Sequence, residues 1–171
     1  MHSSGPSWEN LCMSRNDFDK LRSFVQAEKT LTLATSDEQG EPHAASLFYW
    51  SDEQLSLYWL SSNKSRHSLH LAVRPQASLS IHANAASWRE IRGLQMKGSV
   101  QIIDDDATRS AILTHYRAHF ELGAIFSLPI SRSTLYSFTP VWMRMTDNTH
   151  IFGSKTELEL THDGWQTVRS K

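Results

Sequence analysis

The segment 61–67 holds the densest group of side chains that could bind an anion. It reads Ser-Ser-Asn-Lys-Ser-Arg-His and combines hydroxyl donors with cations, at Ser61, Ser62, Lys64, Ser65 and Arg66. We expect Ser65 to cap a short helix, because residues at helical spacing follow it. The first N–H groups of that helix and the positive end of its dipole then form an anion site. This chemistry suits a terminal phosphate, although an ordinary solvated turn with a serine cap has the same composition.

Three strand-like runs lead into this segment. Thr30–Ser36, Pro42–Trp50 and Leu55–Ser61 are separated by short polar turns. They predict an antiparallel meander, with the polar segment at the end of its third strand. The helix that Ser65 caps ends before Pro75, since proline cannot continue a helix.

The rest of the chain predicts more strands and helices around this meander. A first helix is expected at Arg15–Ala27, capped by Ser14. Beyond the meander we expect two strands, a helix and two further strands, at Ala77–His82, Ile91–Ile103, Asp104–Phe120, Leu135–Asp147 (interrupted at Pro140) and Ile151–Leu160, with a loop over 121–134. Gly93 and Gly98 indicate bulges or close backbone approach. Six or seven strands and three helices, without βαβ alternation, predict an α+β chain dominated by antiparallel sheet.

The composition limits the class of protein. The 171 residues suggest a loose N-terminal segment over 1–13 and a single domain over 14–171. The net charge of −1 gives no general attraction to nucleic acid or to an anionic membrane. The single cysteine, Cys12, excludes a disulfide framework and a cysteine-based zinc site. We expect a cytoplasmic protein, because no apolar signal-peptide core or membrane-spanning run is present.

The order of these motifs resembles a known family. Gly40-Glu-Pro42 between two strands, then a third strand, then Ser61-x-x-x-Ser65-Arg66-His67, resembles the pyridoxamine 5′-phosphate oxidase-like FMN-binding split barrels over about Thr30–Ile103. The tail Thr146-Asp-Asn-Thr149 with Phe152-Gly153 is similar to an uncharacterised bacterial branch of that superfamily. The resemblance implies a split β-barrel of six to seven strands with peripheral helices. It also implies a homodimer that holds FMN at the subunit interface.

The resemblance assigns roles to individual residues. The strand 44–48 would lay its backbone along the isoalloxazine ring, and its small side chains would permit a close approach. The strand 92–98 would add contacts from the barrel or from the partner subunit. The implied cofactor-binding residues are Ala45, Ser46 and Leu47 at the ring, Ser61, Lys64, Ser65, Arg66 and His67 at the phosphate, and Arg92.

Several positions depart from the family pattern. The usual phosphate-binding lysine is His67 here, and an unperturbed histidine is mostly neutral at neutral pH. The arginine and the lysine that flank the ring-facing strand in vitamin B6 oxidases are replaced by Ala45 and Trp50, and a flavin-contacting glutamine falls near Gly93. We therefore expect FMN binding without pyridoxamine-phosphate oxidase activity.

The predicted function is an FMN-dependent oxidoreductase whose substrate the sequence does not identify. FMN would carry the electrons, a nicotinamide nucleotide is a candidate donor, and no side chain is assigned as catalytic. Two alternatives stay open, a non-catalytic haem or flavin carrier and a ligandless structural dimer. The pairs His67/His70 and His115/His119 have helical spacing, but no third ligand accompanies them, so we predict no metal site. A haem needs one axial histidine.

Overall fold

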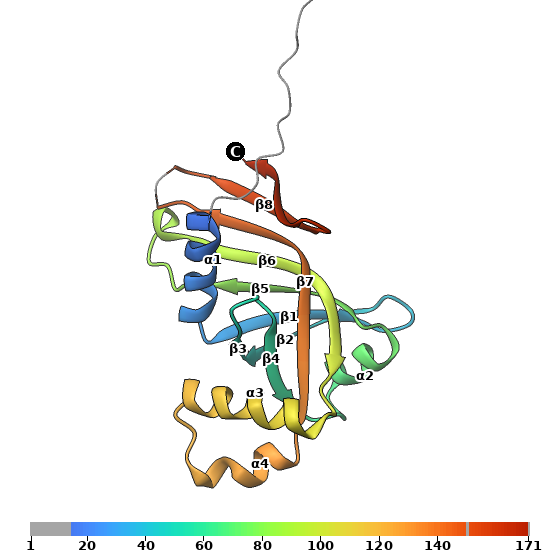
Figure 1. The fold of residues 1–171 in the computed structure, drawn as a ribbon. Helices are drawn as coiled ribbons and strands as arrows, with labels where there is room; N and C mark the ends of the chain where they lie inside the picture. The colour runs from blue at the N-terminus through green and yellow to red at the C-terminus, as the bar shows by residue number, and fades with distance from the viewer. Residues whose placement is uncertain (1–14, 150, 171) are drawn as a thin grey trace, which may run out of the picture.

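Within the described residues, nine antiparallel strands form one strongly curved sheet (Figure 1). In the computed structural model the described residues are 15–149 and 151–170, so the expected segment 1–13 and the cap at Ser14 lie outside them. The strands are β1 (Thr30–Ser36), β2 (Pro42–Phe48), β3 (Trp50–Ser51), β4 (Leu57–Ser61), β5 (Gln76–His82), β6 (Arg92–Ile102), β7 (Thr134–Asp147), β8 (Lys155–Thr161) and β9 (Gly164–Ser170). Their order is β2-β1-β5-β6-β7-β4-β3, with β8 beside β7 and β9 beside β8.

The two ends of this strand order belong to one stretch of chain. Tyr49 alone separates β2 from β3, and β2 pairs with β1 whereas β3 pairs with β4. The buried Tyr49 side chain fixes this bend, because its phenol oxygen donates a 2.6 Å hydrogen bond to the Val25 carbonyl oxygen. The sheet therefore returns on itself as a split barrel, and the predicted α+β fold class is confirmed.

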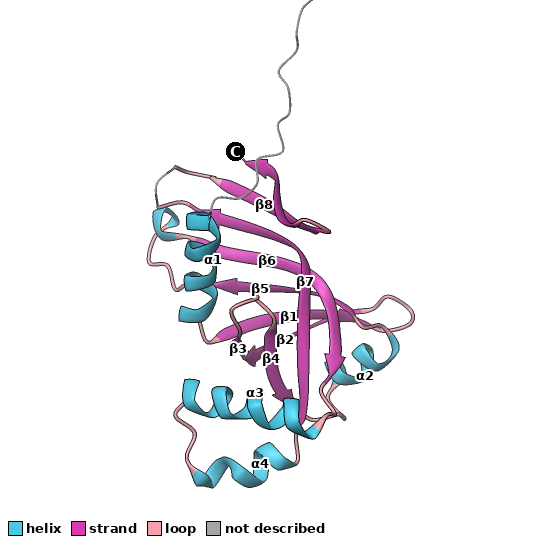
Figure 2. Cartoon of the chain, in the orientation of Figure 1, coloured by secondary structure: helices cyan, strands magenta, loops and turns pink. Residues whose placement is uncertain are grey.

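In the part of the chain that the structure describes, four α-helices lie around the barrel (Figure 2). They are α1 (Arg15–Ala27), α2 (Arg66–Val73), α3 (Asp106–His119) and α4 (Ser127–Ser131), and 3₁₀ turns occur at Trp88–Glu90 and Ala124–Phe126. α2 packs against β1 and β2, whereas α1 and α3 both approach β3. None of the helices in the described part of the chain is long and apolar enough to cross a bilayer.

The alternating pattern of the strands places their apolar side chains in a single core. On β1 the buried positions are Leu31, Leu33 and Thr35, and the intervening residues point outward. Trp59 on β4 is fully buried and stacks on Tyr136 of β7, with ring centroids 5.7 Å apart. Burying one large aliphatic or aromatic side chain contributes roughly 1.5–3 kcal/mol, so this core fixes the barrel frame on which the site is built.

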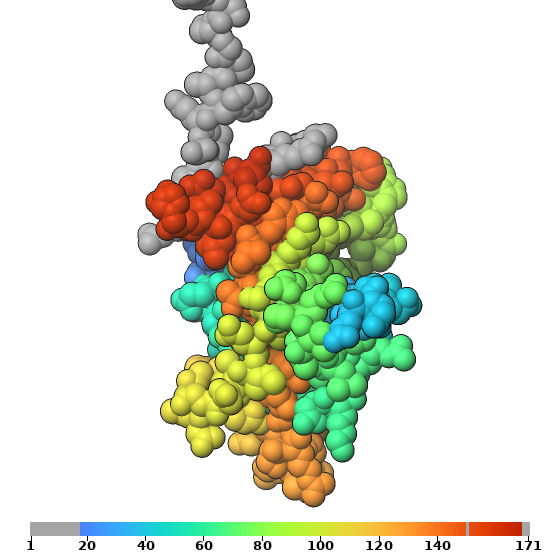
Figure 3. All heavy atoms as spheres, turned by 90° about the vertical axis from the view of Figure 1, so that its right-hand side faces the viewer, coloured from blue at the N-terminus to red at the C-terminus, as the bar shows by residue number. Residues whose placement is uncertain are grey.

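The β1–β2 hairpin brings polar residues beside α2. Its turn needs Gly40, whose φ of +88° is in the left-handed region, and Asp37 accepts a 2.8 Å hydrogen bond from the Glu41 amide. The resulting register pairs Thr35 with His43. Figure 3 shows the hairpin tip lying against α2. This register sets the surroundings of the polar segment that precedes α2.

Two features of the predicted meander are wrong. The second strand does not run unbroken to Trp50, because Tyr49 interrupts it. The third strand starts at Leu57, since Leu55 lies in the preceding turn with a φ of +65° and Asp52 accepts a hydrogen bond from the Ser56 amide. The third strand consequently pairs with β3 and β7 rather than along β2.

The C-terminal half also differs from expectation. β7 continues through Pro140 as a strand, but its register with β6 shifts there: Lys97 pairs with Trp142 and Gly98 with Pro140, which leaves Val141 as the extra residue of a bulge on β7. A Cβ at Gly98 would collide with the Thr139 carbonyl oxygen, which confirms the expected close approach. The last predicted strand begins only at Lys155, the strand β9 was not predicted, and the expected loop over 121–134 contains the Ala124–Phe126 turn and α4.

Candidate functional site

Ser65 is the N-cap of α2, as predicted. Its φ and ψ of −67° and 152° are extended, and its side-chain oxygen accepts a hydrogen bond from the Ser68 amide at 3.4 Å. Its own amide donates to the Ser62 carbonyl oxygen, which closes the turn before the helix. Within the described residues the amides of Arg66 and His67 have no acceptor. Two backbone donors therefore remain available at the positive end of the helix.

His67 is the centre of a polar cluster at this helix start. Its imidazole Nε2 lies 2.8 Å from the Ser61 hydroxyl oxygen and 3.0 Å from the Ser65 hydroxyl oxygen. Ser65 also donates a 2.8 Å hydrogen bond to the Ser68 hydroxyl. The His67 residue is 7 % exposed, so these serines join a nearly buried imidazole to the surface of the turn.

Two more histidines lie close to this cluster. The His70 Nδ1 atom is 3.2 Å from the Thr35 hydroxyl oxygen, and the rings of His43 and His70 meet edge-on with centroids 5.8 Å apart. Burial lowers the pKa of His67, and the neighbouring His43 and His70 lower that pKa further. The unliganded imidazole is thus neutral at pH 7.

Lys64 and Arg66 supply permanent charge at the mouth of the cluster. Both residues are exposed, and neither side chain makes a hydrogen bond or an ion pair with any residue that the structure describes. The first turn of α2 contains no acidic residue. Their charges are therefore unneutralised by the protein and remain available to an anion.

The predicted ring-facing strand begins next to this site. β2 alternates in exposure, with Ala45 and Leu47 half-buried and Ser46 exposed. Outward-pointing Thr32 pairs with Ser46 on one side and with Ser80 on the other. The outer face here is made of small side chains and continues into a groove of about 350 Å³, lined by Thr32, Ala34, Ser78, Leu79, Ser80, Gln95, Met96, Lys97, Trp142 and Arg144. Because side chains alternate along a strand, this groove lies on the face opposite to the one on which Thr35 and His43 meet α2.

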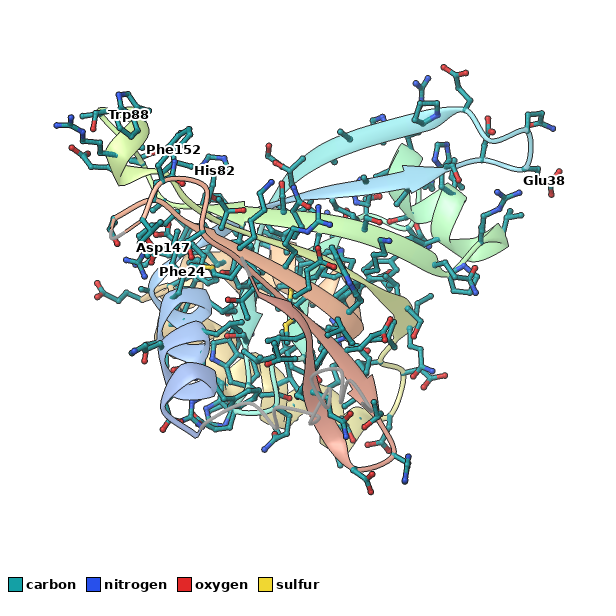
Figure 4. All side chains as sticks on the ribbon, turned by 90° about the horizontal axis from the view of Figure 1, so that it is seen from above. Phe24, Glu38, His82, Trp88, Asp147 and Phe152 are labelled. Atoms are coloured by element: carbon teal, nitrogen blue, oxygen red, sulfur yellow. The ribbon has the colours of Figure 1, made fainter. Side chains whose placement is uncertain are left out.

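The structure does not bring Arg92 to the same place within one subunit. The Arg92 Nε atom lies 3.4 Å from an Asp147 carboxylate oxygen, and its guanidinium lies over the Phe24 ring at 5.1 Å. In Figure 4, Phe24 and Asp147 lie at one end of the molecule and Glu38, at the hairpin tip beside α2, lies at the other. Arg92 therefore lies apart from the cluster at α2 in this chain.

The second histidine pair serves packing. His115 stacks on Trp50 with centroids 5.1 Å apart and an interplanar angle of 5°. His119 packs edge-on against Phe120, and burial followed by the charge of Lys29 lowers its pKa. In the described part of the chain, no three His, Cys, Asp or Glu side chains gather in a way that could hold a metal ion.

Three residues of the cluster were missed by sequence reasoning, namely Thr35, His43 and Ser68. The register of the hairpin could have found the first two, because a turn ending at Gly40 pairs Thr35 with His43. Ser68 stands three residues after the cap, where its amide is the usual partner of a capping side chain.

Comparison with known proteins places the chain in a family. The sequence profile of pyridoxamine 5′-phosphate oxidase matches residues 18–147, from within α1 to the end of β7. The chain belongs to the pyridoxamine 5′-phosphate oxidase family. The resemblance expected from the segment 61–67 and its preceding strands is thereby confirmed, and the family match covers the whole barrel apart from β8 and β9.

Proteins similar to this chain include an uncharacterised family, an FMN-binding protein and a haem storage protein. A UPF0306 protein of Yersinia pseudotuberculosis serotype O:3 (strain YPIII) is 26% identical over 136 residues, covering 79% of this chain and 88% of the relative. A pyridoxamine 5′-phosphate oxidase-related, FMN-binding protein of Nostoc punctiforme superposes with a TM-score of 0.68 at 17% identity, covering 94% of this chain and 97% of that one. The haem storage protein HutZ of Vibrio cholerae superposes with a TM-score of 0.61 at 22% identity, covering 71% and 88%. The two structures establish the fold alone.

Proposed function

We propose that this protein is a flavoprotein in which the start of α2 binds the phosphate of FMN. One observation carries the proposal, namely the pair of exposed, unneutralised cations Lys64 and Arg66 beside a capped helix N-terminus with two open amides. Hydroxyl groups of Ser61 and Ser65 border the same point. Backbone amides, hydroxyls and cations together are the donor set that a phosphate dianion requires.

The residues of the chain fit the rest of this cofactor. Ala45 and Leu47 lie on the half-buried face of β2, which also bears His43 of the cluster, and a flat ring on this face would meet a small side chain and an apolar one; Ser46 points to the opposite, exposed face. Bound FMN supplies two-electron redox chemistry, while the chain binds and orients it. We assign no side chain as an acid or base. The proposed activity is an oxidoreductase of unspecified substrate, with a nicotinamide nucleotide as the candidate electron donor.

We also propose that the active form is a homodimer. The face of Thr32, Ala34, Ser78 and Ser80 carries only small side chains, which suits close packing against a second copy. At its edge, Trp142 lies between Lys97 and Arg144, with cation-to-ring distances of 4.7 and 5.2 Å. In such a dimer Arg92 of one subunit could reach the cofactor held by α2 of the other.

A haem-binding or flavin-carrier function is the second candidate, because HutZ shares the fold and is a haem storage protein. The chain has exposed histidines at His82 and His115 that could ligate haem iron. A Soret band after haem addition that is lost on a His→Ala substitution would favour this candidate. Bound flavin with no turnover of NADH or NADPH would favour a flavin carrier.

Titration with FMN tests the leading proposal. We expect bound flavin to show a shifted visible spectrum and quenched fluorescence. Arg66→Ala should weaken binding by roughly 10- to 150-fold, because a charged hydrogen bond contributes about 1.5–3 kcal/mol. A lack of binding at tens of micromolar FMN would contradict the proposal, as would full affinity in the Arg66→Ala protein.

A further inference from the structure

We infer that His67 is a proton-dependent ligand of the bound phosphate, so that the site takes up one proton together with each phosphate monoester. This inference rests on the proposed function, because it concerns the same site. The affinity of the site for a phosphate monoester then depends on pH as well as on the charge of the ligand. In the complex the proton lies on the imidazole, which as imidazolium contacts the phosphate dianion.

The geometry places the imidazole where this exchange can occur. The His67 Nε2 atom contacts the hydroxyl oxygens of Ser61 and Ser65 at 2.8 and 3.0 Å, and these serines border the anion site. The hydroxyl of Ser65 already donates to Ser68, so a phosphate oxygen at this point lacks a donor from that group. A protonated imidazole supplies both a further N–H donor and a positive charge.

The groups around His67 do not favour a proton until an anion arrives. His70 on α2 and His43 on β2 lie close enough to disfavour its proton, and the charged residues next to it in the chain, Lys64 and Arg66, are exposed cations, so none of these groups is negative. Ser61 on β4 is uncharged, and Thr35 on β1 contacts His70. The acids of the packed hairpin make no hydrogen bond or ion pair with His67 within the described residues: Asp37, Glu38 and Glu41.

A dianion therefore provides the missing negative charge. Burial and the nearby histidines lower the pKa of His67 from its usual 6.5 in the free protein. The second pKa of a phosphate monoester is about 6. Above about pH 7 both partners are deprotonated before they meet, and the complex gains one proton. By linkage, the affinity then falls about tenfold for each unit of rising pH.

The pH dependence of FMN and riboflavin binding tests this inference. The dissociation constant of FMN should rise about tenfold per pH unit from about pH 7 to 8.5, whereas that of riboflavin, which lacks the phosphate, should stay constant. Calorimetry in buffers of different ionisation enthalpy should show uptake of about one proton per FMN at pH 7.5. The imidazole resonances of His67 should shift to the protonated form on FMN addition.

Substitutions locate the proton. His67→Lys should bind FMN with little pH dependence over this range, because a lysine stays charged up to about pH 10. His67→Asn should bind FMN weakly and without a slope. The matched control His162→Asn, an exposed histidine in the turn between β8 and β9, should keep the tenfold slope.

The outcomes separate this inference from the proposed function. FMN binding that is independent of pH in the unsubstituted protein overturns the role of His67 and leaves the flavin site standing. The role of His67 is also overturned if the pH dependence of FMN binding is lost in His70→Asn but kept in His67→Asn. Failure to bind FMN at any pH overturns the flavin site itself. The calorimetric and NMR measurements use the unsubstituted protein, so they decide the question even where a His67 variant does not fold.

Discussion

Two helices of this molecule begin with the same local geometry in opposite electrostatic surroundings. Ser65 caps α2 by accepting from the Ser68 amide, and Asp105 caps α3 by accepting from the Thr108 amide at 2.8 Å. In each case the side chain bonds the amide three residues later. The first residue of α2, however, is Arg66, whereas α3 starts at Asp106, directly after its acidic cap.

The difference shows what a capped helix N-terminus needs in order to become an anion site. In α3 the negative side chains of segment 104–106 already compensate the positive end of the helix dipole. In α2 the flanking Lys64 and Arg66 add to that potential, and no acidic residue of the first turn opposes it. Capping is shared by both helices, so under our proposal the surrounding charge decides that α2, and not α3, binds the phosphate.

The largest expected effect on FMN binding comes from reversing the charge of Arg66, the first residue of α2. We expect Arg66→Asp to raise the Kd of FMN at least roughly a hundredfold, since it removes a charged hydrogen bond and adds repulsion. The matched change Asp106→Arg on α3 should leave that Kd unchanged. Fluorescence titration of both variants checks this. Equal losses of affinity would mean that the substitutions act through folding rather than through the site.

Replacing the N-cap residue of each helix should separate helix stabilisation, which Ser65 and Asp105 share, from FMN binding, which we assign to α2 alone. Ser65→Ala should lower the free energy of unfolding by about 1 kcal/mol, measured by denaturant titration, and Asp105→Ala should lower it as well. Only Ser65→Ala should also weaken FMN binding, by roughly five- to tenfold, because the Ser65 hydroxyl holds the His67 imidazole at the phosphate. An unchanged FMN affinity in Ser65→Ala would show that its hydroxyl serves the helix alone.

Acid should destabilise the two helix starts in different pH ranges. The pKa of His67 is lowered in the folded protein by burial, so stability without ligand should decline as pH falls below about 6.5, where the unfolded chain takes up the proton first. The pKa of Asp105 is lowered by its hydrogen bonds to Thr108, so its contribution should disappear only as pH falls below 3.8 and through its folded pKa. Thermal melts from pH 8 to 3 should show that His67→Asn removes the first decline and Asp105→Asn the second.

The smallest expected effect concerns Lys64. Its exposed ammonium acts on the phosphate through water, so Lys64→Ala should weaken FMN binding by roughly threefold at low salt. The effect should vanish near 0.5 M salt, where the screening length falls to about 4 Å. The control Lys29→Ala, directly before β1, should show no effect at either salt concentration. A loss that persists in high salt would indicate direct contact with the phosphate.

The local elements were predictable from sequence where a local cause fixes them. α1 and β1 have the predicted bounds, because helical spacing and strict alternation leave no other interpretation, and Ser65 and Pro75 mark the ends of α2. The break at Tyr49 was not predictable, since it depends on closure of the barrel. That β7 continues through Pro140 was not predictable either, because it depends on which strands pair with β7 at that point. β7 pairs with β4 up to Phe138 and with β8 from Trp142, so the proline lies where that edge has no partner strand.

The site was predictable only in part. The serines and cations of segment 61–67 are adjacent in sequence, and the structure gathers Ser61, Ser65 and His67 into one cluster. His43 joins them through the hairpin register, a long-range feature that a single motif does not contain. Arg92 was placed with the site from the family resemblance, whereas pairing with Asp147 holds it at the other end of the subunit.

The affinity ratio of FMN to riboflavin tests the central claim most directly, because the two ligands differ only in the phosphate. Measured at pH 7 on the unsubstituted protein, FMN should bind at least roughly a hundredfold more tightly than riboflavin, and Arg66→Asp should reduce this ratio to about one. Equal affinities for the two flavins in the unsubstituted protein would contradict a phosphate site at the start of α2.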